Sequence, residues 1–447
     1  MKQLLILSAL VLLISCQEEE KPSYVIFDGM IKNSVAEEAI ISGKDFEAKL
    51  PIGTDGKFAD TLDIKENGYY ELYINRERTA MYLEKGKTLV VNLDAMRFDE
   101  TLAYGGDLAA ENNYLATKFL MDEGNKDFEK MYSLPEEEFS AELIKQNEKY
   151  DSLLKVSKIP NENFTDLESR ENKFGFTTNL EVYEEYHRYL TGDKDFTVSG
   201  KFYEPIKDVN FADTTTFRNS IAYQNMLNTH FSRLAGDSGT VGYLKKVDEN
   251  LPDGYAKDLL MTNFLEFGLK PDENLDEAYN IYKKSNSNSD NLAAITARYD
   301  LLKTITKGNP SPSFNYENFK GGTTSLDDLK GKIIYIDVWA TWCGPCIREI
   351  PALKEVEKEF SSKNVAFVSI SIDRKSEYET WRSMIEEKEL GGIQLFADND
   401  WKSQFLADYG ILGIPRFIIL DTEGNIISAD APRPSDPKLT EMLEELI

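Results

Sequence analysis

The chain has 447 residues, of which 41% are hydrophobic, and a formal net charge of −27 at pH 7. That apolar fraction supports a packed core, and the length predicts two or three domains. The strong net acidity argues against nucleic-acid binding, for which a basic patch is expected. Beyond the N-terminal apolar run, no hydrophobic stretch is long enough to span a membrane.

The first 16 residues have the form of an export signal. Lys2 supplies a positive charge, and the apolar run Leu4–Ile14 is shorter than the roughly 20 residues of a membrane-spanning helix. The run ends in Leu-Ile-Ser-Cys16, which resembles the lipobox of bacterial lipoproteins. The resemblance implies cleavage before Cys16, lipidation of its thiol, and a tether over residues 17–23. An ordinary signal peptide with an incidental cysteine is the alternative. Either reading implies export to an oxidising compartment.

Residues 24–104 show the pattern of short strands separated by turns such as Thr54-Asp55-Gly56. Strands this short predict an antiparallel sandwich or barrel. The expected strands are Tyr24–Lys32, Ala39–Ser42, Phe46–Leu50, Lys57–Ile64, Tyr69–Ile74, Thr79–Leu83 and Thr88–Leu93.

Residues 105–307 change to a helical pattern, with apolar residues three and four positions apart. The charge clusters between them are typical of solvated helix faces. The expected helices are Ala109–Met121, Pro135–Lys155, Leu180–Leu190, Thr215–Leu234, Gly254–Phe267, Asn274–Ser285 and Asn291–Lys307.

A linker rich in residues that interrupt helices and strands begins at Gly308. It opens a C-terminal domain, 308–447, that contains a CxxC motif. The apolar, β-branched run Ile333–Val338 predicts a strand, and a helical pattern follows the cysteines as far as Phe360. Strand, tight turn, CxxC and helix form the layout of a dithiol redox site.

The position of Cys343 at a helix N-terminus predicts a nucleophile. Unpaired backbone N–H groups and the helix dipole favour thiolate there, whereas a free cysteine, with a pKa of about 8.5, is only roughly 3% thiolate at pH 7. Cys346, about one turn on, is predicted to resolve a mixed disulfide. Gly344 permits close approach, and Pro345 suits the first helical turn. No second CxxC supports a zinc site, and we expect no metal or other cofactor.

Further features of the C-terminal domain form one pattern with the CxxC. They are Pro312-Ser313-Phe314, the segment Ser325–Lys332, Trp339-Ala-Thr-Trp-Cys-Gly-Pro-Cys346, Pro351, and Gly413-Ile-Pro-Arg-Phe-Ile-Ile-Leu420. Together they resemble the thioredoxin superfamily, most closely its TlpA/ResA group of membrane-anchored thiol–disulfide oxidoreductases. In arrangement, the β-rich segment is similar to a domain of unknown function that precedes a thioredoxin-like domain in many Bacteroidota lipoproteins.

The resemblance implies roles for residues outside the CxxC. Pro415 matches the family's cis-proline, which is plausible because only X–Pro bonds adopt cis at modest cost, and Ile414 before it would lie at the substrate surface. Asp337 matches a buried acid near the second cysteine. A desolvated carboxyl has a raised pKa and can accept the proton of Cys346. An outward-facing strand aspartate is the alternative.

Two positions depart from the thioredoxin pattern. Ser369 stands where thioredoxins carry a lysine near the acid, so we expect Asp337 to lack a cationic neighbour and to titrate higher. Arg416 follows the cis-proline, where a small polar residue is usual. Its guanidinium could stabilise the Cys343 thiolate, bind an acidic group of the substrate, or face solvent. Trp342, Gly344 and Pro345 complete the predicted substrate-binding residues.

These patterns predict a multidomain protein with an N-terminal all-β sandwich-like domain, a central α-helical region and a C-terminal α/β thioredoxin fold. The expected function is that of a lipid-anchored thiol–disulfide oxidoreductase in the cell envelope, facing the periplasm, that reduces disulfides of exported proteins. The Gly-Pro pair between the cysteines favours this direction. The resemblance implies a DsbD/CcdA-like membrane electron donor, and apocytochrome c as one conceivable substrate.

Two alternatives remain open at this point. The first is an oxidase or isomerase on the same fold, because thioredoxin and DsbA share a fold although their potentials differ by about 150 mV. The second is a binding or sensing lipoprotein, in which residues 24–307 capture a ligand and the dithiol is accessory.

Overall fold

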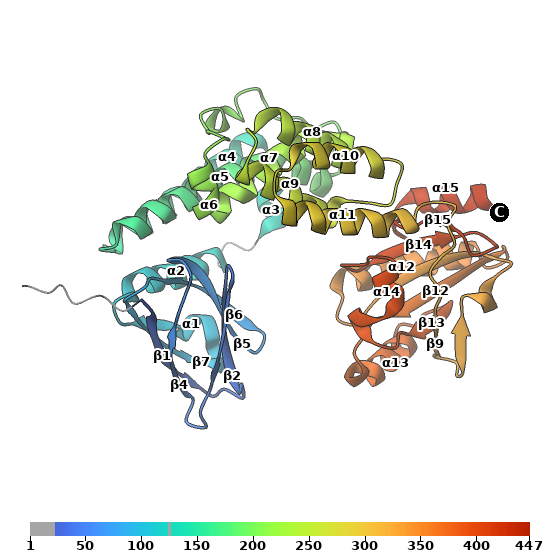
Figure 1. Ribbon diagram of the computed structural model, residues 1–447, viewed down its shortest axis with the longest axis horizontal. Helices are drawn as coiled ribbons and strands as arrows, with labels where there is room; N and C mark the ends of the chain where they lie inside the picture. The colour runs from blue at the N-terminus through green and yellow to red at the C-terminus, as the bar shows by residue number, and fades with distance from the viewer. Residues whose placement is uncertain (1–22, 124–126) are drawn as a thin grey trace, which may run out of the picture. The chain divides into compact units, whose positions relative to one another are not determined.

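The computed structural model of the protein describes residues 23–123 and 127–447 (Figure 1). The predicted signal peptide, Cys16 and nearly all of the tether lie outside the described residues. The chain divides into two compact units: the first runs to Asp208 and includes Asn219–Met226, and the second comprises Val209–Arg218 and Leu227–Ile447. Within the described residues, no helix combines the length and apolarity needed to cross a membrane.

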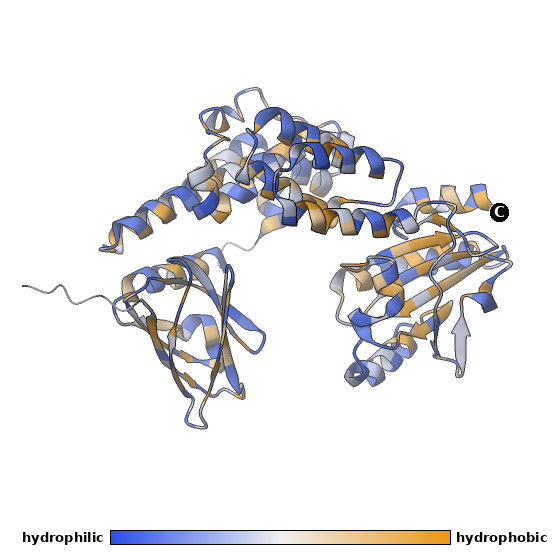
Figure 2. Cartoon of the chain, in the orientation of Figure 1, coloured by the Kyte–Doolittle hydropathy of each residue, from blue (hydrophilic) through white to orange (hydrophobic). Residues whose placement is uncertain are grey.

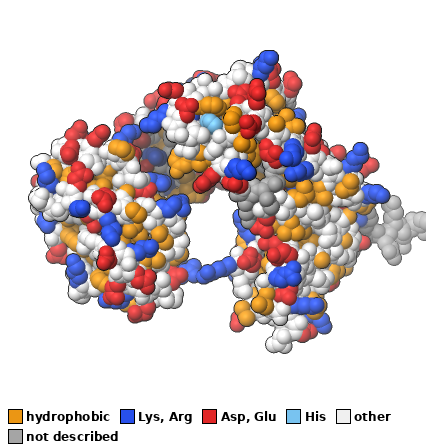
Figure 3. Space-filling model, turned by 180° about the vertical axis from the view of Figure 1, so that it is seen from behind, with side chains coloured by type: hydrophobic (Ala, Val, Ile, Leu, Met, Phe, Trp, Pro, Cys, Tyr) orange, Lys and Arg blue, Asp and Glu red, His pale blue; other side chains and the backbone are white. Residues whose placement is uncertain are grey.

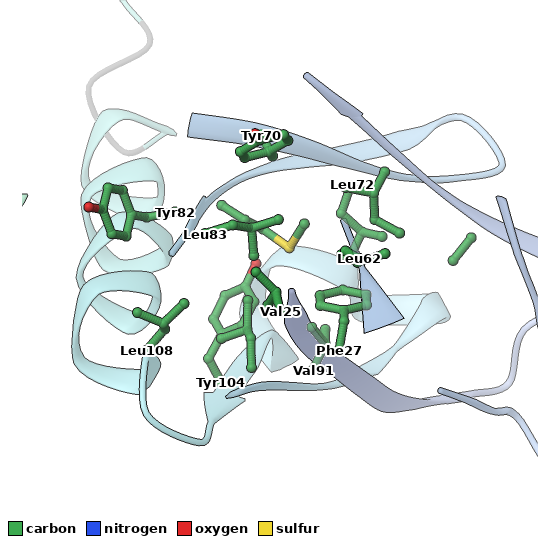
Figure 4. Close-up of a cluster of buried hydrophobic side chains, with 14 of the residues drawn as sticks. Val25, Phe27, Leu62, Tyr70, Leu72, Tyr82, Leu83, Val91, Tyr104 and Leu108 are labelled. Carbon is green, nitrogen blue, oxygen red and sulfur yellow. The ribbon is translucent and has the colours of Figure 1, made fainter. Parts of the chain in front are cut away.

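The β-rich region consists of two four-stranded sheets, ordered β4-β1-β7-β8 and β3-β2-β5-β6. The strands are β1 (Val25–Lys32), β2 (Glu38–Gly43), β3 (Phe46–Pro51), β4 (Lys57–Leu62), β5 (Gly68–Ile74), β6 (Glu77–Leu83), β7 (Thr88–Asp94) and β8 (Ala103–Gly105). Alternate side chains of both sheets are buried in one core, as Figure 4 shows for Phe27, Leu72 and Val91. The prediction of a sandwich-like β region is therefore confirmed.

The expectation of a purely antiparallel sandwich is wrong at one pair of strands. β1 and β7 run parallel, with Phe27 opposite Leu89. These strands are far apart in the sequence, and the long connection between them permits a parallel pairing that a two-residue hairpin does not.

Helices complete the core of this β-rich region. α1 (Phe98–Thr101), α2 (Ala109–Glu123) and α5 (Glu162–Thr191) contribute buried residues to it, and α4 (Glu136–Val156) packs against it through Leu153 and Leu154. α3 (Phe128–Tyr132) contacts α4 and α5 instead. Tyr114 of α2 and Phe164 of α5 belong to the same buried cluster as the strands. Asn112 of α2 is fully buried, and its side chain pairs with both the N–H and the C=O of Tyr82 in β6, at 2.8 and 3.0 Å.

The central region, 105–307, is helical as predicted, and its helices are shared between the two compact units. Its remaining helices are α6 (Thr214–Asn219), α7 (Ile221–Ala235), α8 (Gly239–Asn250), α9 (Tyr255–Gly268), α10 (Leu275–Ser285) and α11 (Ser289–Thr304). From Leu227 onward they belong to the unit that contains the C-terminal domain. Apolar periodicity reveals a helix but not the element that covers its apolar face, so the sequence pattern could not show which unit each helix joins.

Within the central helical region, two helices and most of a third were absent from the prediction. α3 and α8 were not expected, and α5 begins at Glu162 rather than Leu180. Part of the reason lies in the buried face of α5, which includes Glu168 and Asn172. Lys118 of α2 pairs with both side chains, at 2.8 and 2.6 Å. Buried polar residues interrupt the apolar spacing by which a helix is recognised.

The C-terminal domain is built on a seven-stranded sheet, ordered β10-β9-β13-β12-β11-β14-β15. The strands are β9 (Asn315–Asn318), β10 (Thr323–Ser325), β11 (Ile333–Trp339), β12 (Val365–Ser371), β13 (Ile393–Phe396), β14 (Arg416–Leu420) and β15 (Ile426–Ser428), and the helices are α12 (Gly344–Glu359), α13 (Tyr378–Glu387), α14 (Gln404–Asp408) and α15 (Pro437–Leu446). β11, β12 and β13 are parallel, and β14 is antiparallel to β11. This is the predicted thioredoxin-like α/β domain.

One face of the sheet packs against α12 and α15. Tyr335 of β11, Leu353 of α12 and Leu439 of α15 share one buried cluster, and Figure 2 shows the central strands of this domain in orange. On the face drawn in Figure 3, acidic and basic side chains are interspersed.

The linker that opens the C-terminal domain is tied to the sheet. The N–H groups of Gly308 and Ser311 donate to the carbonyls of Ile426 and Gly424, at 2.8 and 3.0 Å, and the N–H of Ile426 donates to Asn309, at 2.8 Å. The linker is therefore an extended segment that is hydrogen-bonded along β15, and not a flexible connection between domains.

Candidate active site

Cys343 and Cys346 form a disulfide at the N-terminal end of α12, with their Cα atoms 5.3 Å apart. Cys343 is the N-cap, and its Sγ accepts a hydrogen bond from the N–H of Cys346 at 3.2 Å. Pro345 lies in the first turn, where its missing N–H costs no hydrogen bond. The geometry places the Cys343 sulfur at the positive end of the helix dipole, where a thiolate is stabilised.

The cis-proline segment lies at the end of β11 that leads into the CxxC. The peptide bond between Ile414 and Pro415 is cis, and β14 begins with Arg416 opposite Val338. Gly344, Pro345 and Trp342 are exposed at the turn itself, Trp342 to 50%. The Trp342 ring lies 6.3 Å from that of Trp401. An accessible apolar surface therefore adjoins the buried disulfide.

Asp337 lies on the side of β11 that α12 covers. Side chains alternate along a strand, so Asp337 shares a face with Ile333 and Tyr335, which belong to the cluster with α12. Across the sheet, Asp337 is opposite Ser369 in β12, and Ser369 is opposite Gln394 in β13. The outward-facing alternative does not hold.

The environment of Asp337 disfavours its charged form. Desolvation raises the pKa of this half-buried carboxyl, and the charges of Glu349 and Glu357 raise it further, to about 8. Asp337 and Cys346 line the same narrow cavity. The group can therefore exchange a proton near neutral pH, beside the second cysteine.

Arg416 does not face solvent. Its Nη1 lies 2.8 Å from Asp430, and the Arg416 side chain is 23% exposed. Lys270 pairs with the other oxygen of Asp430, also at 2.8 Å. The guanidinium charge is thus partly neutralised by a carboxylate, which weakens any effect on the Cys343 thiolate.

Asp373 holds the turn that leads to Cys343, a role that was not predicted from the sequence. Asp373 is 1% exposed. Its two oxygens accept the N–H of Thr341 at 3.0 and 3.1 Å and the Thr341 hydroxyl at 2.7 Å, while the Ser371 hydroxyl donates at 2.7 Å. The signal that could have revealed it is its place just after β12, because adjacent parallel strands β11 and β12 end at the same edge of the sheet.

Comparison with known proteins identifies the family. The Redoxin family matches residues 306–444. The chain is 34% identical over 123 residues to "Thioredoxin-like protein YneN" of Bacillus subtilis, which covers 27% of this chain and 69% of that protein. The chain belongs to the thioredoxin-like thiol–disulfide oxidoreductases. It is also 27% identical over 125 residues to "Thiol-disulfide oxidoreductase ResA" of Bacillus subtilis, covering 28% of this chain and 67% of that protein.

Among solved structures, one similar to this thioredoxin-like oxidoreductase is the thioredoxin domain of a thiol–disulfide oxidoreductase from Bacteroides vulgatus. It has 30% sequence identity and a TM-score of 0.29, and the match covers 32% of this chain and 97% of that one. The activity of the family is thiol–disulfide exchange, and Cys343 and Cys346 are the two cysteines among the described residues.

The raised pKa of Asp337 predicts a pH-dependent stability. Its value of about 8 lies above the ordinary value of 3.8, so between these values the folded state binds more protons than the unfolded state, and stability falls as pH rises. We expect Asp337→Asn to unfold at a higher temperature than the wild type, by a margin that grows from pH 5 to about pH 8. Thermal unfolding of the oxidised proteins measures this; a constant margin would contradict the prediction.

The hydrogen bonds of Asp373 predict a second effect. In Asp373→Asn, an amide group replaces one acceptor oxygen and meets the donors of Thr341, so we expect a loss of about 1–3 kcal/mol in the free energy of unfolding. Because the turn before Cys343 is loosened, we also expect slower reaction with a small aromatic disulfide. The exposed Asp398→Asn is the matched control. An Asp373→Asn protein with wild-type stability and rate would show that the turn does not depend on this carboxylate.

Proposed function

We propose that this protein is a lipid-anchored, exported reductant of protein disulfides that acts through its Cys-Gly-Pro-Cys dithiol. The observation that carries the proposal is Cys343 as the N-cap of α12, with Cys346 adjacent and able to close the disulfide. The Gly-Pro pair between the cysteines supports the reducing direction, and Leu-Ile-Ser-Cys16 supports the anchor.

In this mechanism, the Cys343 thiolate attacks one sulfur of a substrate disulfide. A mixed disulfide forms, and the other substrate sulfur leaves as a thiolate. Cys346 then attacks the Sγ of Cys343, so that the Cys343–Cys346 disulfide forms and the second substrate thiolate leaves. Two electrons pass from the dithiol to the substrate disulfide.

Asp337 is the proposed proton acceptor of the second step. Cys346 must lose its proton before it attacks, and Asp337 lines the cavity beside it. With a pKa of about 8, a minor but sufficient fraction of Asp337 is ionised at neutral pH, and its conjugate acid returns the proton in the reverse reaction. Ile414, Pro415 and Trp342 would hold the extended substrate segment.

The proposed setting is the cell envelope, with the protein held at a membrane through Cys16 and facing the periplasm. A reductant in an oxidising compartment needs an electron supply, so we propose a DsbD/CcdA-like membrane donor. The substrates would be exported disulfide-containing proteins, with apocytochrome c as one candidate.

The reduction potential of the Cys343–Cys346 pair tests the direction. We expect a value near or below about −250 mV, as in thioredoxin-like reductants, because the Gly-Pro pair between the cysteines is the thioredoxin arrangement. Equilibration of the protein in graded dithiothreitol buffers, followed by thiol alkylation, measures it. A value near about −120 mV would make the protein a DsbA-like oxidant. Failure to form the disulfide at all would favour the binding-protein alternative.

A Cys16→Ala variant tests the anchor. In bacterial cells, we expect the wild type to fractionate with membranes and to incorporate labelled fatty acid, and the variant to do neither, because the thiol is the acceptor of the lipid. Cys346→Ser serves as the control, since it also loses one thiol but keeps Cys16. A Cys16→Ala protein that carried label, or a wild type that did not, would remove lipidation from the proposal.

A further inference from the structure

A narrow cavity of about 10 Å³ lies under α12, beside Cys346 and Asp337. Its wall includes Trp339 of β11 and Gln394 of β13, which are 2% and 5% exposed. This volume is at the lower limit for holding one water molecule, and a water at such a site needs two to four polar partners. The polar groups that surround the cavity decide whether the site suits one.

Two buried polar atoms of the cavity wall are unpaired. Trp339 Nε1, a donor, and Gln394 Oε1, an acceptor, have no hydrogen-bond partner among the residues that the structure describes. The orientation of the Gln394 amide is set by its Nε2, which donates to the carbonyl of Gly391 at 2.8 Å. Buried polar groups of this kind are normally satisfied by protein or by ordered water.

Glu357 is the second carboxyl in the wall of this cavity. It lies three helical turns after Cys346 on α12 and so on the same helix face. Its carboxyl lies against the turn before β13, since a Cβ added to Gly391 would come within 2.2 Å of Glu357 Oε2, and one added to Gly392 within 2.9 Å of Oε1. The side chain is half-buried and can therefore connect the cavity with solvent.

We propose that Glu357 relays the proton of Asp337 to solvent through one water molecule held by Trp339 Nε1 and Gln394 Oε1. A water has two hydrogens and two lone pairs. It accepts from Trp339 and donates to Gln394, which leaves one lone pair for the acid form of Asp337 and one hydrogen for the Glu357 carboxylate. The site thus provides the hydrogen bonds that a proton relay requires.

The relay returns the site to its starting state. Cys346 loses its proton to the Asp337 carboxylate and attacks the Sγ of Cys343, and the substrate leaves as a thiolate. The acid form of Asp337 then gives its proton to the water, which passes one of its own hydrogens to Glu357. Glu357 releases that proton to bulk solvent, and both carboxylates and the water are restored. The inference rests on the role proposed above for Asp337 but not on the direction of exchange.

The electrostatics of the cavity support proton sharing near neutral pH. Burial raises the pKa of Glu357 to about 7, against an opposing effect of Lys354. This pKa is close to the value of about 8 for Asp337.

Other ionisable groups also lie near Asp337. Glu349 accepts the N–H and the hydroxyl of Ser435, at 3.0 Å each. The pKa of Tyr335 is raised by burial and by the charge of Asp337. Lys354 Nζ donates to the carbonyl of Lys388 at 3.0 Å.

Glu357→Gln in the full-length protein tests the relay. The readout is the second thiolate released when reduced protein reacts in a stopped-flow single turnover with dithiobis(nitrobenzoate), because that release reports attack by Cys346. We expect it to slow about tenfold at pH 7 and to recover as the concentration of a small buffer such as imidazole is raised. The pH inflection of this step should also fall, because a negative neighbour of Asp337 is removed. The exposed Glu355→Gln on the same helix is the control.

Gln394→Leu provides a second test that leaves Glu357 in place, and it should show the same slow, buffer-dependent release. The relay would be overturned if both variants released the second thiolate at the wild-type rate, or if the release were slow and no buffer restored it. A shift of the pH inflection alone would not rescue it. Asp337→Asn separates the two hypotheses. If its release is slow while Glu357→Gln and Gln394→Leu are normal, only the relay fails; if its release is also normal, the proton acceptor proposed above fails with it.

Discussion

The packing of α12 across β11 is the constraint on which the active site depends. Both elements belong to one buried cluster, so the N-terminal end of the helix is held at the carboxyl end of the strand. The helix dipole then acts on Cys343, and the next turn carries Cys346 over the side chains of the strand. Asp337 lies under Cys346 because side chains alternate along β11, which puts every other residue on the face that α12 covers.

The same packing accounts for the electrostatics of the site. Asp337, Ser369 and Gln394 form a polar row across three parallel strands beneath the helix. No cationic side chain occupies this row, and the charges that act on Asp337 are those of Glu349 and Glu357, so burial and repulsion both favour the protonated acid. The folded protein is therefore less stable at alkaline pH, and the pKa of this carboxyl lies in the range of thiol pKa values.

A second contact fixes the other side of the turn. Asp373 follows β12 and receives three hydrogen bonds from Thr341, two positions before Cys343. The turn is therefore held from the strand next to β11, while the cis-proline segment approaches from β14 on the opposite side. Three adjacent strands thus converge on one dithiol, and Trp342 is exposed beside it.

The sequence by itself determined the chemistry and most of the local structure. The cysteine spacing, the apolar strand before it and the Gly-Ile-Pro segment indicated a thioredoxin-like dithiol, and alternation indicated the strands of the β-rich region, because these features depend on residues close together in the chain. Only the tertiary structure decided which elements meet. It paired β1 with β7 in parallel, divided the helices between two units, joined Arg416 to Asp430, and brought Asp373 and Glu357 to the active site. Such contacts join residues far apart in sequence or on different elements, and a local pattern carries no information on which partner covers a given face.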